Sequence, residues 1–143
     1  MTLRRKSREF ALQMLFEWDM TRQDPPRVEK LFWKSASAAA ATRQFANELF
    51  EGAVRQASVI DELVGRLAEN WRLERLAAID RTILRLAIYE LRAQTAPPKV
   101  IIDEAVELAK KFSSAEAPAF LNGVLDAAHK TLVRCNGRTG SDP

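Results

Sequence analysis

The segment from Glu74 to Leu91 constrains the fold more than any other part of the chain. Drawn as a helix at 100° per residue, it gathers its charged side chains on one narrow face, at Glu74, Arg81, Arg85 and Arg92. Apolar side chains cover most of the remaining circumference: Leu76, Ile79, Ile83, Leu84, Leu86, Ala87, Ile88 and Leu91. A helix that is apolar nearly all round must be surrounded by other helices. The sequence therefore predicts a central helix inside an all-α domain.

The flanking segments repeat the helical period, but with apolar residues on one face only. Between Leu3 and Met20, for example, Ala11, Met14 and Leu15 fall on a single stripe. Further helices are predicted over residues 28–32, 42–54, 58–67, 101–112 and 118–132, with Thr42 and Ser58 as helix caps. The loops are short and no repeat or linker separates the helices, which predicts one compact domain of about seven helices over residues 1–135. Residues 136–143 are polar and are expected to form a disordered tail.

The start of the first helix carries four cations within five residues: Arg4, Arg5, Lys6 and Arg8. Cations at the positive end of a helix dipole cost about 0.3–1 kcal/mol each. A bound phosphate would reverse this cost, because the N-terminal N–H groups and the arginine side chains both bind anions. The cluster therefore indicates a polyanionic ligand. The alternative is a solvated basic end with no ligand.

Phe120 is the second candidate. It lies about 100° from the stripe that contains Leu121, so it is a candidate platform for RNA bases. The alternative is that Phe120 belongs to the core. Close to it in sequence, Gly123 is best explained by a close helix–helix contact.

Two carboxylates, Asp80 and Glu90, fall among apolar neighbours on the central helix and should be paired or face a groove or partner. No second group converges on either in the sequence, so we do not expect an enzyme. The lone His129 and the lone Cys135 do not make a metal site, and no cofactor motif is present. No apolar run is long enough for a membrane span, and we expect a cytoplasmic protein.

Four blocks of the chain together resemble the NusB family. They are Arg4–Phe16, Ile83–Leu91, Val100–Lys110 and Phe120–Asp126, and they occur in the family's order and spacing over nearly the whole chain. The resemblance implies a seven-helix, cytoplasmic bacterial transcription antitermination factor. Such factors bind boxA RNA together with the ribosomal protein NusE, join the RNA polymerase elongation complex with other Nus factors, and support ribosomal RNA synthesis.

The resemblance also implies roles for individual residues. Arg4, Arg5, Lys6 and Arg8 would contact RNA phosphates and base edges, and the RNA surface would be completed by Asp80, Arg85 and Phe120. The side expected to face NusE carries Phe16, Glu74 and Arg75. Family members usually have Tyr at the position of Phe16 and a cation at the position of Ala119, so this chain lacks one hydroxyl and one charge there.

Three interpretations remain open from the sequence. The first is the RNA-binding antitermination factor, as a monomer or as a homodimer. The second is a protein-interaction bundle with no direct role in RNA binding. The third is an isolated NusB-like domain related to RNA cytosine methyltransferases, whose catalytic domain does not fit within 143 residues.

Overall fold

The computed structural model describes residues 3–67 and 76–141, with side chains for residues 4–67 and 76–134. This part of the chain forms seven α-helices: α1 (Leu3–Thr21), α2 (Pro25–Ser35), α3 (Ala40–Arg55), α4 (Ala57–Leu67), α5 (Ala78–Ala93), α6 (Pro98–Phe112) and α7 (Ala117–Ser141). No strand occurs in these ranges. The prediction of an all-α fold of about seven helices is confirmed.

Helix α5 lies at the centre, as its sequence predicts. Every residue from Thr82 to Ile88 is buried, and Glu90 and Leu91 extend the buried stretch. Helices α1, α3, α6 and α7 all pack against α5. The approach of α3 is so close that a Cβ on Gly52 would overlap the Tyr89 ring, so any larger residue there requires that ring to shift.

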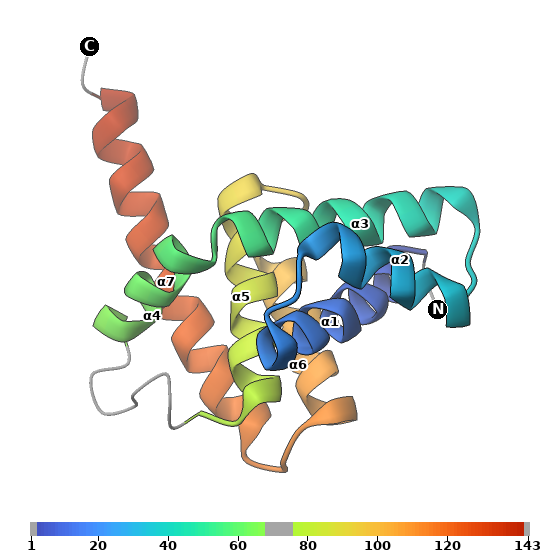
Figure 1. The fold of residues 1–143 in the computed structure, drawn as a ribbon. Helices are drawn as coiled ribbons and strands as arrows, with labels where there is room; N and C mark the ends of the chain where they lie inside the picture. Colours follow the sequence, from blue (N-terminus) through green and yellow to red (C-terminus); the bar gives the residue numbers. More distant parts are fainter. Residues whose placement is uncertain (1–2, 68–75, 142–143) are drawn as a thin grey trace.

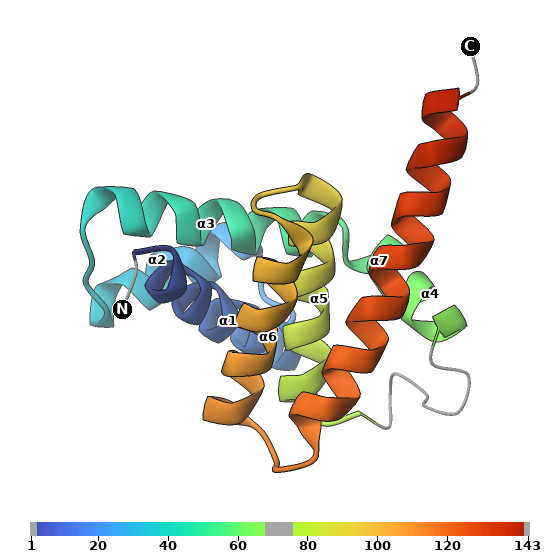
Figure 2. The same cartoon turned by 180° about the vertical axis from the view of Figure 1, so that it is seen from behind.

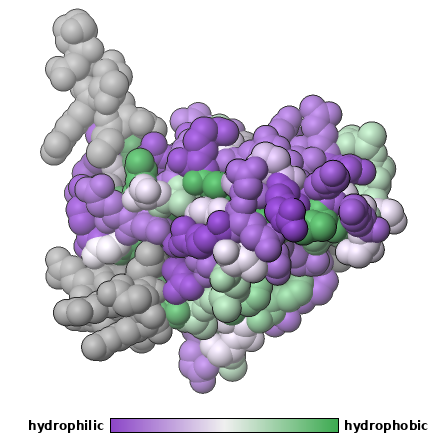
Figure 3. Space-filling view, in the orientation of Figure 1, coloured by the Kyte–Doolittle hydropathy of each residue, from purple (hydrophilic) through white to green (hydrophobic). Residues whose placement is uncertain are grey.

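The other helices divide into two groups on either side of α5 (Figures 1 and 2). Helices α1, α2 and α3 form one group, and α4 and the long α7 lie on the opposite side. Helix α6 lies beside α5 and faces α1, so that a groove between α1 and α6 opens to solvent. Seen from the side of α2, the surface is mostly hydrophilic over α2 and α3, and a paler, moderately hydrophobic area lies below them (Figure 3).

Prolines mark several helix boundaries. Pro25 and Pro98 open α2 and α6, and Pro118 lies in the first turn of α7, where a missing backbone N–H has no intrahelical partner to lose. Within the described ranges, no helix has the length and apolar character needed to cross a membrane.

Several boundaries differ from the sequence prediction. The N-cap of α3 is Ala39 instead of Thr42, because Thr42 is buried in the first turn, where its carbonyl accepts a hydrogen bond from Ser7. Helix α4 begins at Ala57, directly after the last turn of α3, so Ser58 is not its cap. At the end of the chain, α7 extends to Ser141, and the expected domain boundary at residue 135 stays a prediction.

Candidate nucleic-acid interface

The basic residues at the start of α1 point in different directions, because successive helical residues are rotated by 100°. Arg4 lies towards α3, with its guanidinium carbon 4.4 Å from the centre of the Phe45 ring, and it donates a hydrogen bond to the carbonyl of Thr95 at 3.0 Å. Arg5 lies towards α6, where it pairs with Glu104. The sequence cluster is therefore not one cluster in space.

Arg8 points into the core. Its guanidinium donates hydrogen bonds to both carboxylate oxygens of Glu90, over 2.8–3.1 Å, and only 4% of the Arg8 side chain is exposed. Removing one partner of a buried ion pair costs about 3–5 kcal/mol. A phosphate at the surface cannot reach this group without that cost. In this structure Arg8 fastens α1 to α5, and its expected contact with RNA stays a prediction.

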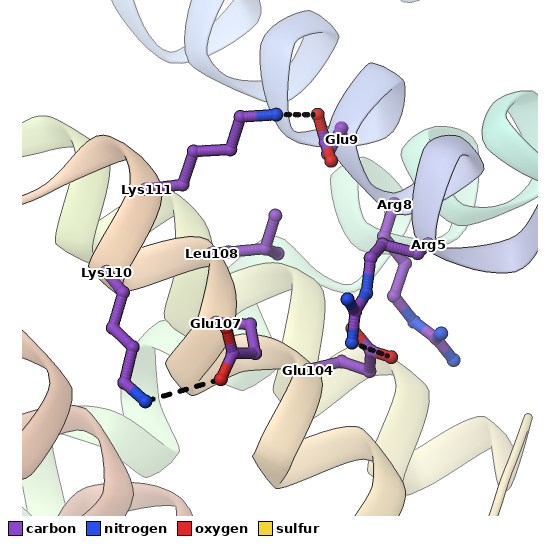
Figure 4. A pocket seen from close by; sticks show the side chains of 8 residues that line it. All are labelled: Arg5, Arg8, Glu9, Glu104, Glu107, Leu108, Lys110 and Lys111. Atoms are coloured by element: carbon purple, nitrogen blue, oxygen red, sulfur yellow. Dashed lines mark hydrogen bonds and ion pairs between the residues drawn. The ribbon is translucent and has the colours of Figure 1, made fainter. Parts of the chain in front are cut away.

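A groove of about 250 Å³ lies between α1 and α6, next to Arg5 (Figure 4). Its lining is mostly charged: Arg5, Arg8, Glu9, Glu104, Glu107, Leu108, Lys110 and Lys111. Arg5 makes two hydrogen bonds to Glu104, at 2.9 and 3.1 Å, across the groove. The hydrogen bonding to Glu104 and the charge of that carboxylate raise the pKa of Arg5 against the opposing effect of burial, so the guanidinium stays charged. We name this feature the α1/α6 groove.

Two lysines of α6 complete the α1/α6 groove. The ammonium of Lys111 lies 2.7 Å from Glu9 on α1, and that of Lys110 lies 3.3 Å from Glu107. More than half of each lysine side chain is exposed, 53% and 60% respectively. The Lys110–Glu107 pair is exposed on both sides and is worth only about 0–1 kcal/mol, so an incoming phosphate can replace Glu107 at little cost. Glu9 is only 6% exposed, so a phosphate that approaches Lys111 has to bind beside this carboxylate and does not displace it.

Lys110 and Lys111 are predicted from the sequence to lie on the outer face of their helix, but no role is expected for them there. The sequence does not mark them as binding residues, because lysines in the last turn of a helix are also explained by their favourable interaction with the negative end of the helix dipole. Only the packing of α6 against α1 shows that they face Arg5.

Asp80 and Phe120 lie near the junction of α5, α6 and α7. The Ser113 hydroxyl donates a hydrogen bond to Asp80, which ties the end of α6 to the first turn of α5. Phe120 is half-buried in the first turns of α7 and packs against the core. Phe120 therefore contributes to packing, and its role as a platform for RNA bases stays a prediction.

Arg85 is buried, with 4% of its side chain exposed, and it links three helices. It donates two hydrogen bonds of 2.8 Å to Asp61 on α4 and one to Asp19 on α1. Burial raises the pKa of Asp19, but hydrogen bonds from Arg81 and Arg85 outweigh it and hold that pKa below its usual value. The structure gives Arg85 a structural role between α1, α4 and α5, and its expected contact with RNA stays a prediction.

The predicted partner-binding residue Phe16 borders an apolar groove. This groove has a volume of about 550 Å³ and is lined by Leu12, Gln13, Phe16, Ala77, Ala78, Ile79 and Phe112. Phe16 and Phe112 are 37% and 38% exposed, which is unusual for such large apolar side chains. We name this feature the Phe16 groove. The other two predicted partner-binding residues, Glu74 and Arg75, lie outside the described residues.

The comparisons with known proteins point to one family. The sequence model of the NusB family matches residues 5–130. A transcription antitermination protein NusB from Koribacter versatilis is 47% identical over 131 residues, which cover 90% of each chain. Another from Sorangium cellulosum is 42% identical and covers 94% of this chain and 96% of its own.

Solved structures agree with these sequence matches. NusB from T. maritima superposes with a TM-score of 0.81 at 34% identity, covering 90% of this chain and 92% of its own. A crystal structure of the antitermination factors NusB and NusE in complex with dsRNA gives a TM-score of 0.83 at 28% identity, with coverages of 92% and 98%. The helices described above, and the family match over residues 5–130, lead to the same conclusion: this chain belongs to the NusB family of transcription antitermination proteins.

Proposed function

We propose that this protein binds boxA-type single-stranded RNA together with NusE. The observation that carries the proposal is the α1/α6 groove, where the cations Arg5, Lys110 and Lys111 line one solvent-open depression. Lys6, exposed on α1 beside Arg5, adds a further charge. These cations come from helices that are distant in sequence, so the fold itself assembles them.

The chemistry of the groove suits a phosphate backbone. Arg5 and Lys110 exchange Glu104 and Glu107 for phosphates. Lys111, whose ammonium has three N–H donors, binds a phosphate while it keeps the buried Glu9. Phe120 supplies a partly exposed aromatic ring on which an unpaired base stacks. Asp80, held by Ser113, accepts a hydrogen bond from a base edge nearby.

The Phe16 groove is the proposed site for NusE. An exposed apolar depression that contains two large aromatic residues is the kind of surface that a protein partner covers. The complex of NusB with NusE and dsRNA, which is similar in fold, supports the combination of a protein and an RNA ligand. A homodimer that covers this surface is the alternative occupant.

In this proposal the protein acts without catalysis, in the cytoplasm, as an adaptor. It delivers the RNA–NusE complex to the RNA polymerase elongation complex, where other Nus factors join it, and supports transcription of ribosomal RNA operons. No cofactor takes part.

A titration of labelled boxA-type RNA, with and without NusE, tests the proposal. Single-stranded RNA and its duplex form are compared, because the related complex contains dsRNA. We expect the single strand to bind more tightly when NusE is present. Absence of binding to either RNA form, with NusE present and the protein correctly folded, would overturn the proposal.

A further inference from the structure

Helix α2 carries a basic outer face. Arg27, Lys30 and Lys34 are all exposed and lie within an arc of about 60° on this helix, on the side away from the buried Val28. None of the three cations makes an ion pair, hydrogen bond or ring contact with another described residue. We name these three residues the α2 basic face.

No acidic side chain neutralises this face from within α2. The only acid in the helix is Glu29, which lies on another side, towards Glu51 of α3. Burial, together with the neighbouring Glu51 carboxyl, raises the pKa of Glu29 to about 8. At neutral pH Glu29 is therefore mostly protonated, and α2 presents three positive charges with little compensation.

An aromatic cluster connects the α2 basic face to the start of α1. The Phe10 ring of α1 packs edge-on against Phe32 and Trp33 of α2, with ring centres 5.7 and 5.2 Å apart. The ammonium of Lys6 lies 5.0 Å above Phe10, and the guanidinium of Arg43 lies 5.1 Å above Trp33. Lys6 thus lies between the α1/α6 groove and α2, and cations follow one another from α6 across α1 to α2.

We propose that the α2 basic face binds the phosphate backbone of the RNA that flanks the segment held at the α1/α6 groove. This inference rests on the proposed function and extends it from a short motif to a longer RNA. Arg27 and Lys34 are separated by about 10 Å along the helix axis. A stacked strand covers that length in about three nucleotides, one for each cation of the face. Contacts of this kind add affinity without reading the sequence.

The test compares two RNAs and two variants, with NusE present throughout. One RNA is a short boxA-type strand, and the other is the same strand extended by about ten unstructured nucleotides at each end. The variant Arg27→Gln/Lys30→Gln/Lys34→Gln removes the α2 basic face. The matched control, Arg55→Gln/Arg66→Gln/Lys99→Gln, removes three exposed cations on other helices and changes the net charge equally.

We expect the α2 variant to bind the short RNA as the wild type does and to lose the extra affinity for the extended RNA. At about 0.7 per phosphate bound, the slope of log K against log salt for the extended RNA should become shallower by about 2. The same expectation can be stated as the ratio of the binding constants for the extended and the short RNA. In the wild type this ratio should fall about 20-fold when the salt concentration rises fourfold. In the variant the ratio should not depend on salt.

Three results would overturn this inference while leaving the proposed function intact. The α2 variant could bind the extended RNA as tightly as the wild type, which would reassign the face to another kind of partner. The control could lose as much affinity as the α2 variant, which would show an effect of net charge alone. The short RNA could lose as much as the extended one, which would place α2 inside the primary site. Failure of the wild type to bind either RNA would overturn both proposals together.

Discussion

Arg8 and Glu90 form a buried ion pair between the start of α1 and the end of α5, with Nη2 and Oε1 2.8 Å apart and 4% and 2% of the two side chains exposed. The same arginine begins the stripe that continues through Ala11 and Leu15, both of which are in the core. A residue that looks like part of a basic RNA-binding cluster is therefore part of the interior.

The substitution Arg8→Ala is predicted to lower the free energy of unfolding by about 3–5 kcal/mol, because it leaves Glu90 charged and buried without its partner. Lys6→Ala, at an exposed position in the same cluster, should change it by no more than about 0.5 kcal/mol. Urea denaturation measures both values. A fully stable Arg8→Ala protein that has lost RNA binding would return Arg8 to the RNA surface.

Replacing Lys110 and Lys111 together by Gln is predicted to weaken RNA binding with little effect on stability. The Lys110–Glu107 pair is exposed on both sides and contributes little, and the amide of a glutamine at position 111 can still donate a hydrogen bond to the nearly buried Glu9. The slope of log K against log salt should become shallower by about 1.4, or about 0.7 for each phosphate that the variant no longer binds. RNA titrations over a range of salt concentrations measure this. An unchanged slope would exclude the α1/α6 groove as the RNA-binding surface.

Phe120→Leu is predicted to separate stacking from packing. Leucine retains most of the apolar volume at this half-buried position but has no aromatic face. Loss of a stacked base should weaken RNA binding by about 1–3 kcal/mol, whereas the free energy of unfolding should change by less than about 1.5 kcal/mol. RNA titration and denaturation are compared on the same preparation. Equal RNA affinity for Phe120 and its leucine variant would place this ring in the core alone.

The Glu29 carboxyl predicts a dependence of stability on alkaline pH. Its pKa rises to about 8 in the folded protein, through burial and the nearby Glu51, from an ordinary value of 4.5. The folded state therefore holds this proton more tightly than the unfolded state. The associated stability is complete below about pH 4.5 and is lost as the pH rises through 8.

Glu29→Gln removes the titrating group, so this variant should gain stability relative to the wild type as the pH increases between those two values. Denaturation at about pH 5, 7 and 9 measures the difference. Asp61→Asn is not a suitable control, because it breaks the bond to Arg85, whereas Glu62→Gln changes an exposed carboxyl. If the Glu29→Gln and wild-type curves run parallel over this range, the pKa of Glu29 is not raised.

Gln94 ends α5 in the left-handed region, with φ at 56°. A left-handed conformation costs a non-glycine residue about 1–2 kcal/mol, and glycine loses about 0.5–1 kcal/mol more backbone entropy on folding. Gln94→Gly should therefore raise the free energy of unfolding by about 0.5–1 kcal/mol. Gln94→Ala, which retains the Cβ, should produce no such gain. A decrease with glycine would mean that the Gln94 side chain stabilises this turn.

The elements that the sequence predicts well are those with a strong local signal. The apolar circumference of α5 depends on local geometry, and the central position that it predicts is confirmed. The prediction of Thr42 and Ser58 as helix caps was wrong, because tertiary packing overrides cap preference. Thr42, for example, is buried, and its carbonyl accepts a hydrogen bond from the Ser7 hydroxyl.

The candidate site was harder to predict than the fold. Charge alone does not distinguish Arg5 from Arg8, although the alignment of Arg8 with Ala11 and Leu15 on one stripe was a usable signal. That Arg8 pairs with Glu90, and that Arg5 faces Lys110 and Lys111, depends on contacts across 82 to 106 residues of sequence, which one-dimensional patterns do not contain. The binding roles of all the predicted site residues stay predictions: Arg4, Arg5, Lys6, Arg8, Phe16, Glu74, Arg75, Asp80, Arg85 and Phe120.

Glu90 has a second partner with a wider consequence. Besides Arg8 of α1, its carboxylate accepts a hydrogen bond from the Thr95 hydroxyl at 2.7 Å, in the turn that leads into α6. The Glu90 carboxylate therefore helps to hold both helices that border the α1/α6 groove, although Glu90 itself does not line the groove. The variant Glu90→Ala should therefore weaken RNA binding as much as the loss of a residue that contacts RNA. The cause would be indirect, because the substitution changes the spacing of α1 and α6 and removes no contact with RNA.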